Sequence, residues 1–256
     1  METITSRQNP LMTHIRKLAG SAAYRRQTGE CLCDSPKLLR EAAQWGADVR
    51  TVVSVLPWDG PLPDHVRQVL VPPEVMPSIS PAKTPQGVLF TCAIPVLPVP
   101  ETLPGRRYVV LDGVQDPGNV GTLLRSAAAF GFDGVLLSDG CASVFAPKTL
   151  RASMGAAVRI PVIEAGKMPE AIALLREKGI TCLAAALYQS QPLSAAASSY
   201  PDGVCVVIGS EGQGLTDETI AACTGTVRIP MTDRVESLNA GIAGSILLWH
   251  FREESL

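Results

Sequence analysis

The chain has 256 residues, of which 46% are hydrophobic, so it can fill one large or two small cores. No apolar run reaches the length that spans a bilayer, and the N-terminus lacks the uninterrupted apolar stretch of a signal peptide, so we expect a cytoplasmic protein with no membrane partner. The net charge of −2 does not by itself indicate a nucleic-acid partner.

The first 91 residues are predicted to form a small α/β domain. Their apolar spacing predicts helices over 10–20, 36–45 and 64–70, and strands over 49–55 and 87–91. A Pro-rich stretch follows, with prolines at positions 95, 98, 100 and 104, which disfavours both a helix and a central strand. We therefore predict a linker over 92–105 and a second domain over 106–256.

The second domain alternates predicted strands with segments of helical spacing. The strands are expected at 108–111, 134–138, 159–163, 180–186, 204–208 and 226–229. A repeating β-α order predicts an α/β fold with a mainly parallel sheet and helices on both faces.

The most informative segment is LDGVQDPGNVGTLLRSAAAFG, residues 111–131. It places a turn at Asp116–Asn119 between a buried strand and a helix predicted over 122–130, and loops of this kind form active sites in α/β proteins. The helix carries Arg125, a cationic donor. Taken alone, Arg125 is better explained as an ordinary surface residue, and Asn119 as a residue that closes the turn.

Two later segments add polar residues in similar positions. VVIGSEGQGL (206–215) ends an apolar run in a Gly-rich turn that contains Glu211. IPMTDRVESLNAGIAGSILLWHF (229–251) leads from a short strand into a helix. By themselves, Ser237 and Asn239 are typical helix caps, and Met231 and Leu238 are typical core residues.

Together, in order and content, the three segments resemble the motifs of the SpoU class of RNA 2'-O-ribose methyltransferases, which use S-adenosylmethionine. The intermediate stretch Arg151–Ala156 also fits, so the resemblance covers most of 106–251. It implies a C-terminal trefoil knot and a homodimer formed with the help of the last helix. No metal is needed for this reaction.

The resemblance also assigns residues to roles. The catalytic residues that it implies are Asn119, Arg125, Glu211, Ser237 and Asn239. The residues that it implies for donor binding are Ala185, Gly209, Gly212, Ile229, Met231 and Leu238. Arg stays protonated in proteins, so Arg125 is expected to bind the phosphate beside the target ribose and to lower the pKa of the 2'-hydroxyl, while Glu211 pairs with Arg125.

The first domain resembles, more loosely, a small substrate-binding domain with a ribosomal-protein RNA-binding fold. Residues 31–36, CLCDSP, depart from the aromatic-led strand and Glu-Gly that are common there. Residues 1–28 contain five basic residues and one acidic residue, and four of the basic ones are candidates for RNA phosphates: Arg16, Lys17, Arg25 and Arg26. An ordinary solvated helix face explains the same charges equally well.

Seven cysteines without a CxxC pair, and three scattered histidines, predict buried thiols and no metal site. The leading hypothesis for the substrate is ribosomal RNA of the 23S type, with transfer RNA second. A non-catalytic RNA-binding protein that keeps the fold is a further alternative. A nucleotide-dependent enzyme of the Rossmann type is disfavoured, because DPGNVG is not a G-x-G-x-x-G turn.

Overall fold

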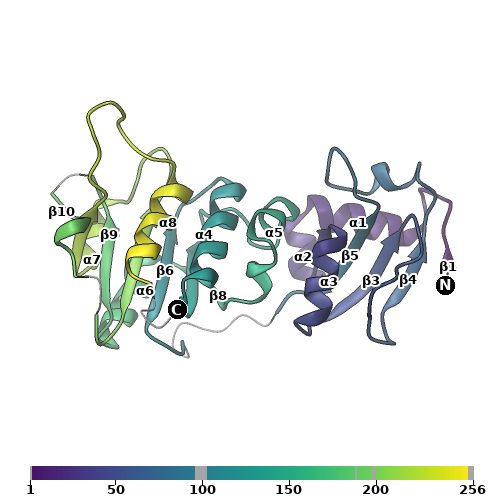
Figure 1. Cartoon of the computed structure of the whole chain (residues 1–256), viewed down its shortest axis with the longest axis horizontal. Helices are drawn as coiled ribbons and strands as arrows, with labels where there is room; N and C mark the ends of the chain where they lie inside the picture. Colours follow the sequence, from purple (N-terminus) through teal and green to yellow (C-terminus); the bar gives the residue numbers. More distant parts are fainter. Residues whose placement is uncertain (1, 96–102, 188, 198–199, 253–256) are drawn as a thin grey trace. The chain divides into compact units, whose positions relative to one another are not determined.

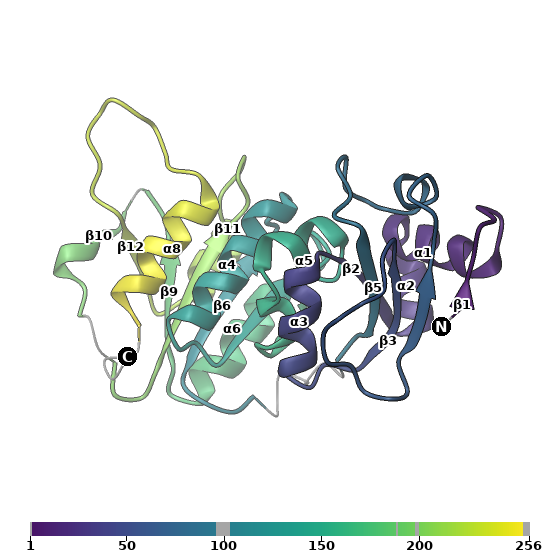
Figure 2. The same cartoon turned by 45° about the vertical axis from the view of Figure 1, so that its right-hand side comes forward.

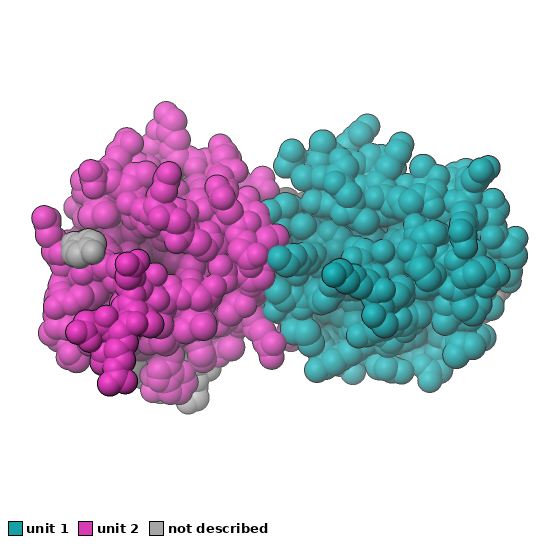
Figure 3. All heavy atoms as spheres, turned by 90° about the horizontal axis from the view of Figure 1, so that it is seen from above, with its two compact units in different colours: residues 1–95, 143–158 teal, residues 96–142, 159–256 magenta. Residues whose placement is uncertain are grey.

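A computed structural model describes residues 2–95, 103–187, 189–197 and 200–252. The chain forms two compact units, which Figure 3 shows in different colours. The first consists of Met1–Pro95 and Ser143–Val158, and the second of Val96–Ala142 and Arg159–Leu256. Most of the predicted linker, 96–102, lies outside the described residues.

The first unit is built on a five-stranded mixed sheet in the order β1-β4-β3-β5-β2 (Figure 1). Its strands are β1 (Glu2–Thr3), β2 (Glu30–Asp34), β3 (Val49–Ser54), β4 (Arg67–Leu70) and β5 (Val88–Ala93). Strand β5 runs antiparallel to β2 and β3, whereas β4 runs parallel to β1 and β3.

The helices of the first unit begin at clear sequence signals. In α1 (Pro10–Gly20), Asn9 caps the first turn and Pro10 takes a position that needs no backbone N–H. One face of α1 then buries Leu11, Met12, Ile15 and Leu18 in the same core cluster as residues of β2, β3, β4 and β5. The other helices of this unit are α2 (Ala22–Thr28), α3 (Pro36–Gln44), the 3₁₀ turn Met76–Ser78, α5 (Pro147–Ser153) and the 3₁₀ turn Ala156–Val158.

The helix predicted over 64–70 is wrong. Residues 67–70 form β4, which pairs with β3 and buries Val69 in the sheet. Over so short a run, the spacing of Val66, Val69 and Leu70 is compatible with both a helix and a strand. The pairing with β3 stabilises the strand. Helix α2 and strand β2 are not among the elements that the sequence pattern predicts.

Residues 143–158 are inserted between β7 and β8 of the second unit but belong to the first by their contacts. Arg151 on α5 donates two hydrogen bonds to the carboxylate of Asp34, at 3.2 and 2.7 Å. Gly155 has a positive φ of 82°, and a Cβ there would lie 2.5 Å from the ring of Trp45. Only glycine combines this backbone conformation with so close a contact. The sequence, which predicts one domain over 106–256, does not reveal this arrangement.

The second unit contains a seven-stranded sheet in the order β10-β12-β9-β11-β6-β7-β8, in which neighbouring strands run parallel. Its strands are β6 (Arg107–Asp112), β7 (Gly134–Ser138), β8 (Val162–Gly166), β9 (Thr181–Ala185), β10 (Gln191–Pro192), β11 (Val204–Gly209) and β12 (Gly225–Arg228). The predicted strands are confirmed, except that β8 begins three residues later than expected. The short edge strand β10 is additional.

Helices cover both faces of this sheet, as predicted from the β-α order. Its helices are α4 (Pro117–Ala129), α6 (Met168–Glu177), α7 (Asp217–Ala222), α8 (Ala240–His250) and the 3₁₀ turn Leu193–Ala195. Helices α4 and α8 lie side by side in both Figures 1 and 2. Tyr108 and Val110 of β6 pack in one core cluster with residues of α6, so the alternate side chains of β6 point toward the opposite face. Within the described residues, no helix combines the length and apolar character needed to cross a bilayer.

Candidate active site

The segment singled out in the sequence forms the start of α4 rather than a turn that precedes it. Asp116 caps the helix by accepting a 3.0 Å hydrogen bond from the backbone N–H of Asn119, and Pro117 is the first helical residue. A Cβ on Gly118 would lie 2.7 Å from Asp116 Oδ1, so the glycine makes room for the cap. The helix therefore starts five residues earlier than predicted, because Asp-Pro acts as a helix start here.

Glu211 connects the second motif to the first. Its Oε1 accepts a 2.8 Å hydrogen bond from Asn119 Nδ2, and its two oxygens also accept from the backbone N–H groups of Gln115, at 3.1 Å, and Asp116, at 3.2 Å. The loop that presents Glu211 is closed by two backbone hydrogen bonds between Ser210 and Gly214. One carboxylate thus fixes the loop after β6 against the loop after β11.

These contacts set the ionisation of Glu211. Burial alone would raise the pKa of this carboxyl, but hydrogen bonds from Asn119 and from the backbone N–H groups of Gln115, Asp116 and Glu211 itself favour the charged form. The net result is a pKa lowered from its ordinary value. Glu211 is therefore a carboxylate at neutral pH and a weak proton acceptor.

Arg125 lies on the exposed side of α4. Among the described residues it has no hydrogen bond or ion pair, and the expected pair with Glu211 is not formed. Asn119, not Arg125, is the side chain that Glu211 holds. The guanidinium donors of Arg125 are therefore available to an anion.

The third motif meets the first at the start of α8. Asn239 caps this helix by accepting a 3.2 Å hydrogen bond from the N–H of Ile242. A Cβ on Gly241 would lie 3.1 Å from Asn119 Oδ1 and 3.2 Å from Asn239 Oδ1, so both side-chain oxygens approach this glycine. Three segments separated in sequence therefore converge around Asn119.

Close packing between α4 and α8 holds this arrangement. A Cβ on Gly244 would lie 2.2 Å from Leu123 Cδ2 and 2.6 Å from Ile208 Cδ1. The next residue on α8, Ser245, has its hydroxyl 2.8 Å from that of Ser126 on α4. The glycines that lower the helix propensity of α8 therefore allow it to approach α4 and β11 closely.

Three of the residues expected to bind the donor lie at one edge of the sheet. Strand β9 lies between β12 and β11 and runs parallel to both, and Val227 pairs with Ala185 while Val207 pairs with Ala184. Ala185, Gly209 and Ile229 therefore lie at or just beyond neighbouring carboxyl ends, which is where ligands bind in open α/β sheets.

The remaining predicted donor and catalytic residues differ in how well the structure constrains them. A Cβ on Gly209 would lie 2.3 Å from the backbone of Gly214, so this position requires glycine, whereas Gly212 is exposed and has open space around it. Met231 and Leu238 are half-buried in the loop between β12 and α8, and Ser237 is exposed there. The loop extends beyond the sheet in Figures 1 and 2.

The structure adds residues that the sequence patterns do not single out. A cavity of about 410 Å³ lies beside the Glu211 loop and is lined by residues on both sides of it, among them Asp112, Gln115, Ser210, Gln213 and Thr216. Of these residues, only Gln115 could have been suspected from the sequence, because it directly precedes Asp116. This cavity extends the candidate site along the carboxyl ends of β6 and β11.

The four basic residues proposed for RNA binding lie in the first unit, and one of them is unsuited to that role. Arg25 is 5% exposed and donates to the carbonyl of Leu18 at 2.7 Å and to Ser143 Oγ at 3.4 Å. Its guanidinium is used in hydrogen bonds inside this unit, so the assignment of Arg25 to RNA phosphates is not supported. Lys17 and Arg26 are exposed, and half-buried Arg16 donates to the carbonyl of Arg7.

The described residues contain no group of three or more His, Cys, Asp or Glu side chains arranged to hold a metal ion. The cysteines in this part of the chain are free thiols, of which five are buried and two, Cys141 and Cys223, are half-buried.

Comparison with known proteins identifies the family. The sequence profile of the SpoU rRNA Methylase family matches residues 106–249, more than half of the chain. An uncharacterized tRNA/rRNA methyltransferase of Synechocystis sp. is 32% identical over 98% of this chain and 94% of its own length. The 23S rRNA (guanosine(2553)-2'-O)-methyltransferase RlmP of Bacillus subtilis is 28% identical over 98% of this chain and 100% of its own length.

Solved structures agree with these relatives. An AdoMet-bound rRNA methyltransferase from Sinorhizobium meliloti superposes with a TM-score of 0.85 at 28% identity, covering 98% of this chain and 97% of that one. A putative RNA methyltransferase of the TrmH family from Porphyromonas gingivalis gives a TM-score of 0.83 at 33% identity, covering 94% and 96%. The chain therefore belongs to the SpoU rRNA methylase family, the class of S-adenosylmethionine-dependent RNA 2'-O-ribose methyltransferases that its three motifs resemble, and it is an enzyme of that class.

Proposed function

We propose that this enzyme methylates a ribose 2'-hydroxyl in ribosomal RNA of the 23S type. The support is the likeness, over nearly the whole of both chains, to the Bacillus subtilis enzyme whose name gives that substrate. Transfer RNA is the alternative substrate, because other relatives are named for either RNA. We propose that the reaction takes place in the cytoplasm.

The observation that carries the proposal is the convergence of the three motifs around Asn119. Glu211 binds Asn119 from the loop after β11, and Asn239 and Gly241 approach it from the start of α8. An RNA-binding protein without catalytic activity has no need for this constellation at the carboxyl edge of a parallel sheet.

The reaction needs a nucleophilic oxygen in line with a methyl–sulfur bond. S-adenosylmethionine supplies a methyl group on a positively charged sulfur. The 2'-oxygen forms a bond to the methyl carbon as the carbon–sulfur bond breaks, and the hydroxyl proton passes to an acceptor or to water. Since opposite charges disappear in this step, a site that partly excludes water favours it.

We assign to Arg125 the binding of the phosphate next to the target ribose. It is permanently charged and has no protein partner among the described residues, so its donors can take a phosphate in a bidentate geometry. Its positive charge lowers the pKa of the nearby 2'-hydroxyl, which makes the oxygen a better nucleophile. Arg125 is thus an electrostatic catalyst and not a base.

Asn119 and Glu211 act as a pair in this proposal. Because Nδ2 of Asn119 is committed to Glu211, its Oδ1 is left to accept a hydrogen bond from the ribose. Glu211 is a positioning residue that fixes the orientation of this amide. Ser237 and Asn239, just before α8, are assigned contacts to the reacting groups.

The donor is assigned to the loops that follow β9, β11 and β12. Main-chain groups at Ala185, Gly209 and Gly212 are assigned to the edge of the adenine. Apolar surface for its two faces comes from Ile229, Met231 and Leu238. These residues fit an adenosyl group, because the side chains are small or apolar and none of them is charged.

We propose that the C-terminal segment is threaded into a trefoil knot. Strand β12 lies two positions from β11 in the sheet, yet α8, which follows it, packs against β11 and α4. The loop over 229–239 must therefore carry the chain back across the carboxyl edge, next to the loop after β11.

We also propose a homodimer through the outer face of α8. On α8, Ile242, Ile246 and Trp249 share helical spacing and are 54%, 37% and 54% exposed. Leu238, which the sequence pattern places on the same face, lies in the loop before the helix. An apolar stripe of this kind on a globular domain marks an interface. Residues 1–91, which form the first unit together with the rest of β5 and residues 143–158, are proposed to bind RNA. The remainder of the predicted domain over 106–256 is proposed to be catalytic, with the linker between 94 and 105.

The test is transfer of labelled methyl from S-adenosylmethionine to total RNA from cells that lack this protein, separated by size. Label in large ribosomal RNA, absent with Arg125→Ala but retained with Arg176→Ala on α6, is the expected result. Label in transfer RNA alone would show that transfer RNA, and not ribosomal RNA, is the substrate. No label in any RNA, with donor binding intact, would favour the non-catalytic RNA-binding alternative.

A further inference from the structure

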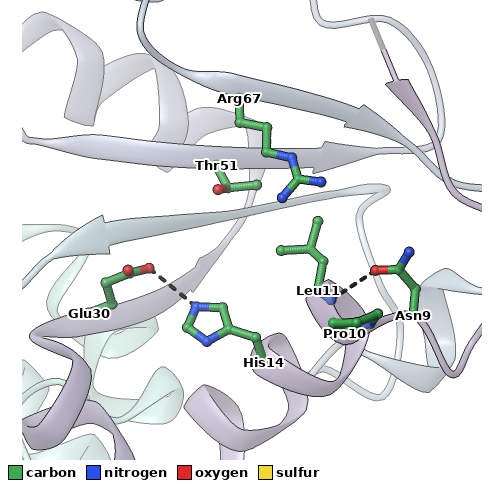
Figure 4. Close-up of a pocket in the computed structure, with 7 residues that line it drawn as sticks. All are labelled: Asn9, Pro10, Leu11, His14, Glu30, Thr51 and Arg67. Atoms are coloured by element: carbon green, nitrogen blue, oxygen red, sulfur yellow. Dashed lines mark hydrogen bonds and ion pairs between the residues drawn. The ribbon is translucent and has the colours of Figure 1, made fainter.

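The first unit contains a polar cavity that no part of the proposed active site uses. It has a volume of about 530 Å³ and is lined by Asn9, Pro10, Leu11, His14, Glu30, Thr51 and Arg67. Figure 4 shows the side chains of Leu11 and His14 on α1 facing those of Thr51 and Arg67 on the strands. Ligand sites typically span about 300–1,000 Å³, so the cavity is large enough for one small organic group.

One wall of the cavity is a carboxylate that the protein holds in place. Glu30 is 16% exposed, and its two oxygens contact different partners: Oε2 lies 3.3 Å from His14 Nε2, and Oε1 accepts a 3.0 Å hydrogen bond from Arg50 Nη1. His14 is itself held by Tyr24, whose hydroxyl lies 3.0 Å from Nδ1. A carboxylate has about four lone-pair positions, so Glu30 keeps unused acceptor capacity in a fixed orientation.

The opposite wall supplies positive charge. Arg67 donates from Nε and Nη2 to Glu2 Oε2, at 3.1 and 2.8 Å. Both partners of this ion pair are about half exposed, so the pair contributes little stability and a phosphate can replace it. Leu11 and Pro10 provide apolar surface between the acidic and the basic wall.

A buried hydroxyl lies close to this arrangement. Thr91 on β5 is the register partner of Thr51 on β3, so both side chains stand on the same face of the sheet. Thr91 is 2% exposed, and its hydroxyl has no hydrogen-bond partner in the described part of the chain. Buried hydroxyls normally have a partner. In this row it is Thr51 that lines the cavity and that a ligand can reach.

We propose that this cavity binds one unpaired nucleotide of the RNA substrate, with its base against Glu30 and its phosphate at Arg67. The inference rests on the proposed function in that it assumes an RNA substrate. The nucleotide is not the methylated one, which the second unit takes. Single-stranded RNA is recognised in this way, by bases that leave the stack and enter protein pockets.

The fixed carboxylate makes the cavity selective. Guanine presents two adjacent N–H donors on its Watson–Crick edge, which match the two oxygens of Glu30. Adenine, cytosine and uracil each present only one donor group at that edge. We therefore expect guanine to be preferred.

The experiment measures binding of the full-length chain to labelled single-stranded RNA nine-mers that differ only in the central base. The expected result is tightest binding with a central G, and a loss of about ten-fold with Glu30→Gln for that RNA alone, the size of one bidentate base contact. Thr51→Val removes a hydroxyl from the cavity without touching the Glu30 contacts, and it should weaken binding several-fold. Asp64→Asn, an exposed change of the same kind in this unit, should have no effect.

Equal binding of the four RNAs, or unchanged binding by folded Glu30→Gln and Thr51→Val, would overturn the proposal. Micromolar binding of free GMP without any effect of these variants on RNA binding would overturn it as well, in favour of a small-molecule site. The same preparations are assayed for methyl transfer. G-selective RNA binding without methyl transfer would contradict the proposed function but not the guanine site. Methyl transfer without G-selective binding would contradict the guanine site but not the proposed function.

Discussion

Asn119 on α4 donates a 2.8 Å hydrogen bond to Glu211, a residue 92 positions later in the chain. The same carboxylate accepts from the backbone of Gln115 and Asp116, so it fixes the entire start of α4. Glu211 therefore acts on the candidate active site through the position of Asn119. Arg125, about two turns further along the helix, has no hydrogen bond or ion pair with any residue that the structure describes.

We expect Glu211→Gln to destabilise the protein at neutral pH but not in acid. Burial opposes ionisation, yet the hydrogen bonds outweigh it and lower the pKa of Glu211 from its usual 4.5. A lowered folded-state pKa gives a stabilisation that is present above the unfolded-state pKa and lost as pH falls through the folded-state value. The difference in urea midpoint between wild type and variant should be constant from pH 7 to about pH 5 and shrink below about pH 4.5.

The control for this experiment is Glu170→Gln, which changes a carboxylate that is 75% exposed. It should show no comparable dependence on pH. If Glu211→Gln were as destabilising at pH 3 as at pH 7, the hydrogen bonds to the charged form would not be the source of its effect.

Arg125→Ala should separate catalysis from donor binding. Arg125 is exposed and unpaired among the described residues, so the unfolding free energy should change by less than about 0.5 kcal/mol. Turnover should fall by about 100-fold, the scale for removing one group that stabilises charge in the transition state. The affinity for S-adenosylmethionine, measured by calorimetry, should stay the same. Equal losses of affinity and turnover would show that Arg125 serves the donor instead.

Arg125→Lys refines this assignment. Lysine keeps the positive charge but loses the bidentate geometry, so its turnover should lie between those of wild type and Arg125→Ala. Activity equal to wild type would mean that charge alone is sufficient.

The sequence predicts most of the second unit because its central strands β6, β7, β9 and β11 are largely buried apolar runs and its connections carry clear helix patterns. It fails where local signals are ambiguous. Asp116-Pro117-Gly118-Asn119 contains residues typical of turns, and only the cap from Asp116 to Asn119 reveals the start of α4. Arg25 has the same sequence environment as Arg26, but the side of α2 on which each lies makes one structural and leaves the other exposed.

The partner of Glu211 could not be predicted from the sequence either. The motifs bring Asn119 and Arg125 into the same helix, two turns apart, and both can donate to a carboxylate. Which of them Glu211 reaches depends on the turn over 210–214, whose closure is set by contacts of Gly209 and Gly214 that local pattern does not specify.

Gly244→Ala should destabilise the second unit. The added Cβ would meet Leu123 and Ile208 at 2.2 and 2.6 Å, and such overpacking costs about 1–3 kcal/mol. The higher helix propensity of alanine relative to glycine offsets at most about 1 kcal/mol of this cost. Gly20→Ala is the matched control, because a Cβ there meets nothing within 4 Å. Thermal unfolding should show a lower midpoint for Gly244→Ala only, and an unchanged midpoint would mean that α8 can move away from α4 at little cost.

Ile246→Glu should convert the proposed dimer into a monomer. It places a charge in the centre of the apolar stripe on α8, between Ile242 and Trp249, where a partner would have to bury it unpaired. Analytical ultracentrifugation should give twice the chain mass for wild type and the chain mass for the variant. Leu56→Glu, at a 72% exposed position in the first unit, should leave the mass unchanged. A monomeric wild type would refute the dimer directly.

Neutralising Lys17 and Arg26 tests the proposed contacts with RNA phosphates. Both are exposed, and each phosphate contact contributes about 0.7 to the slope of log affinity against log salt for single strands. Lys17→Gln combined with Arg26→Gln should therefore lower the slope by about 1.4, that is, by about two such contributions. Lys37→Gln on α3 is the control, since its side chain is 70% exposed and lies 3.9 Å from Glu41.

Arg25 provides the contrast that makes this test specific. Because its guanidinium is buried and bound to Leu18 and Ser143, Arg25→Gln should lower the unfolding midpoint without lowering the salt slope of the protein that remains folded. If the slope for Lys17→Gln with Arg26→Gln equals that of wild type, these two side chains belong to an ordinary solvated face. The RNA would then have to be bound through other positive groups, with Arg67 at the cavity of the first unit the next to neutralise.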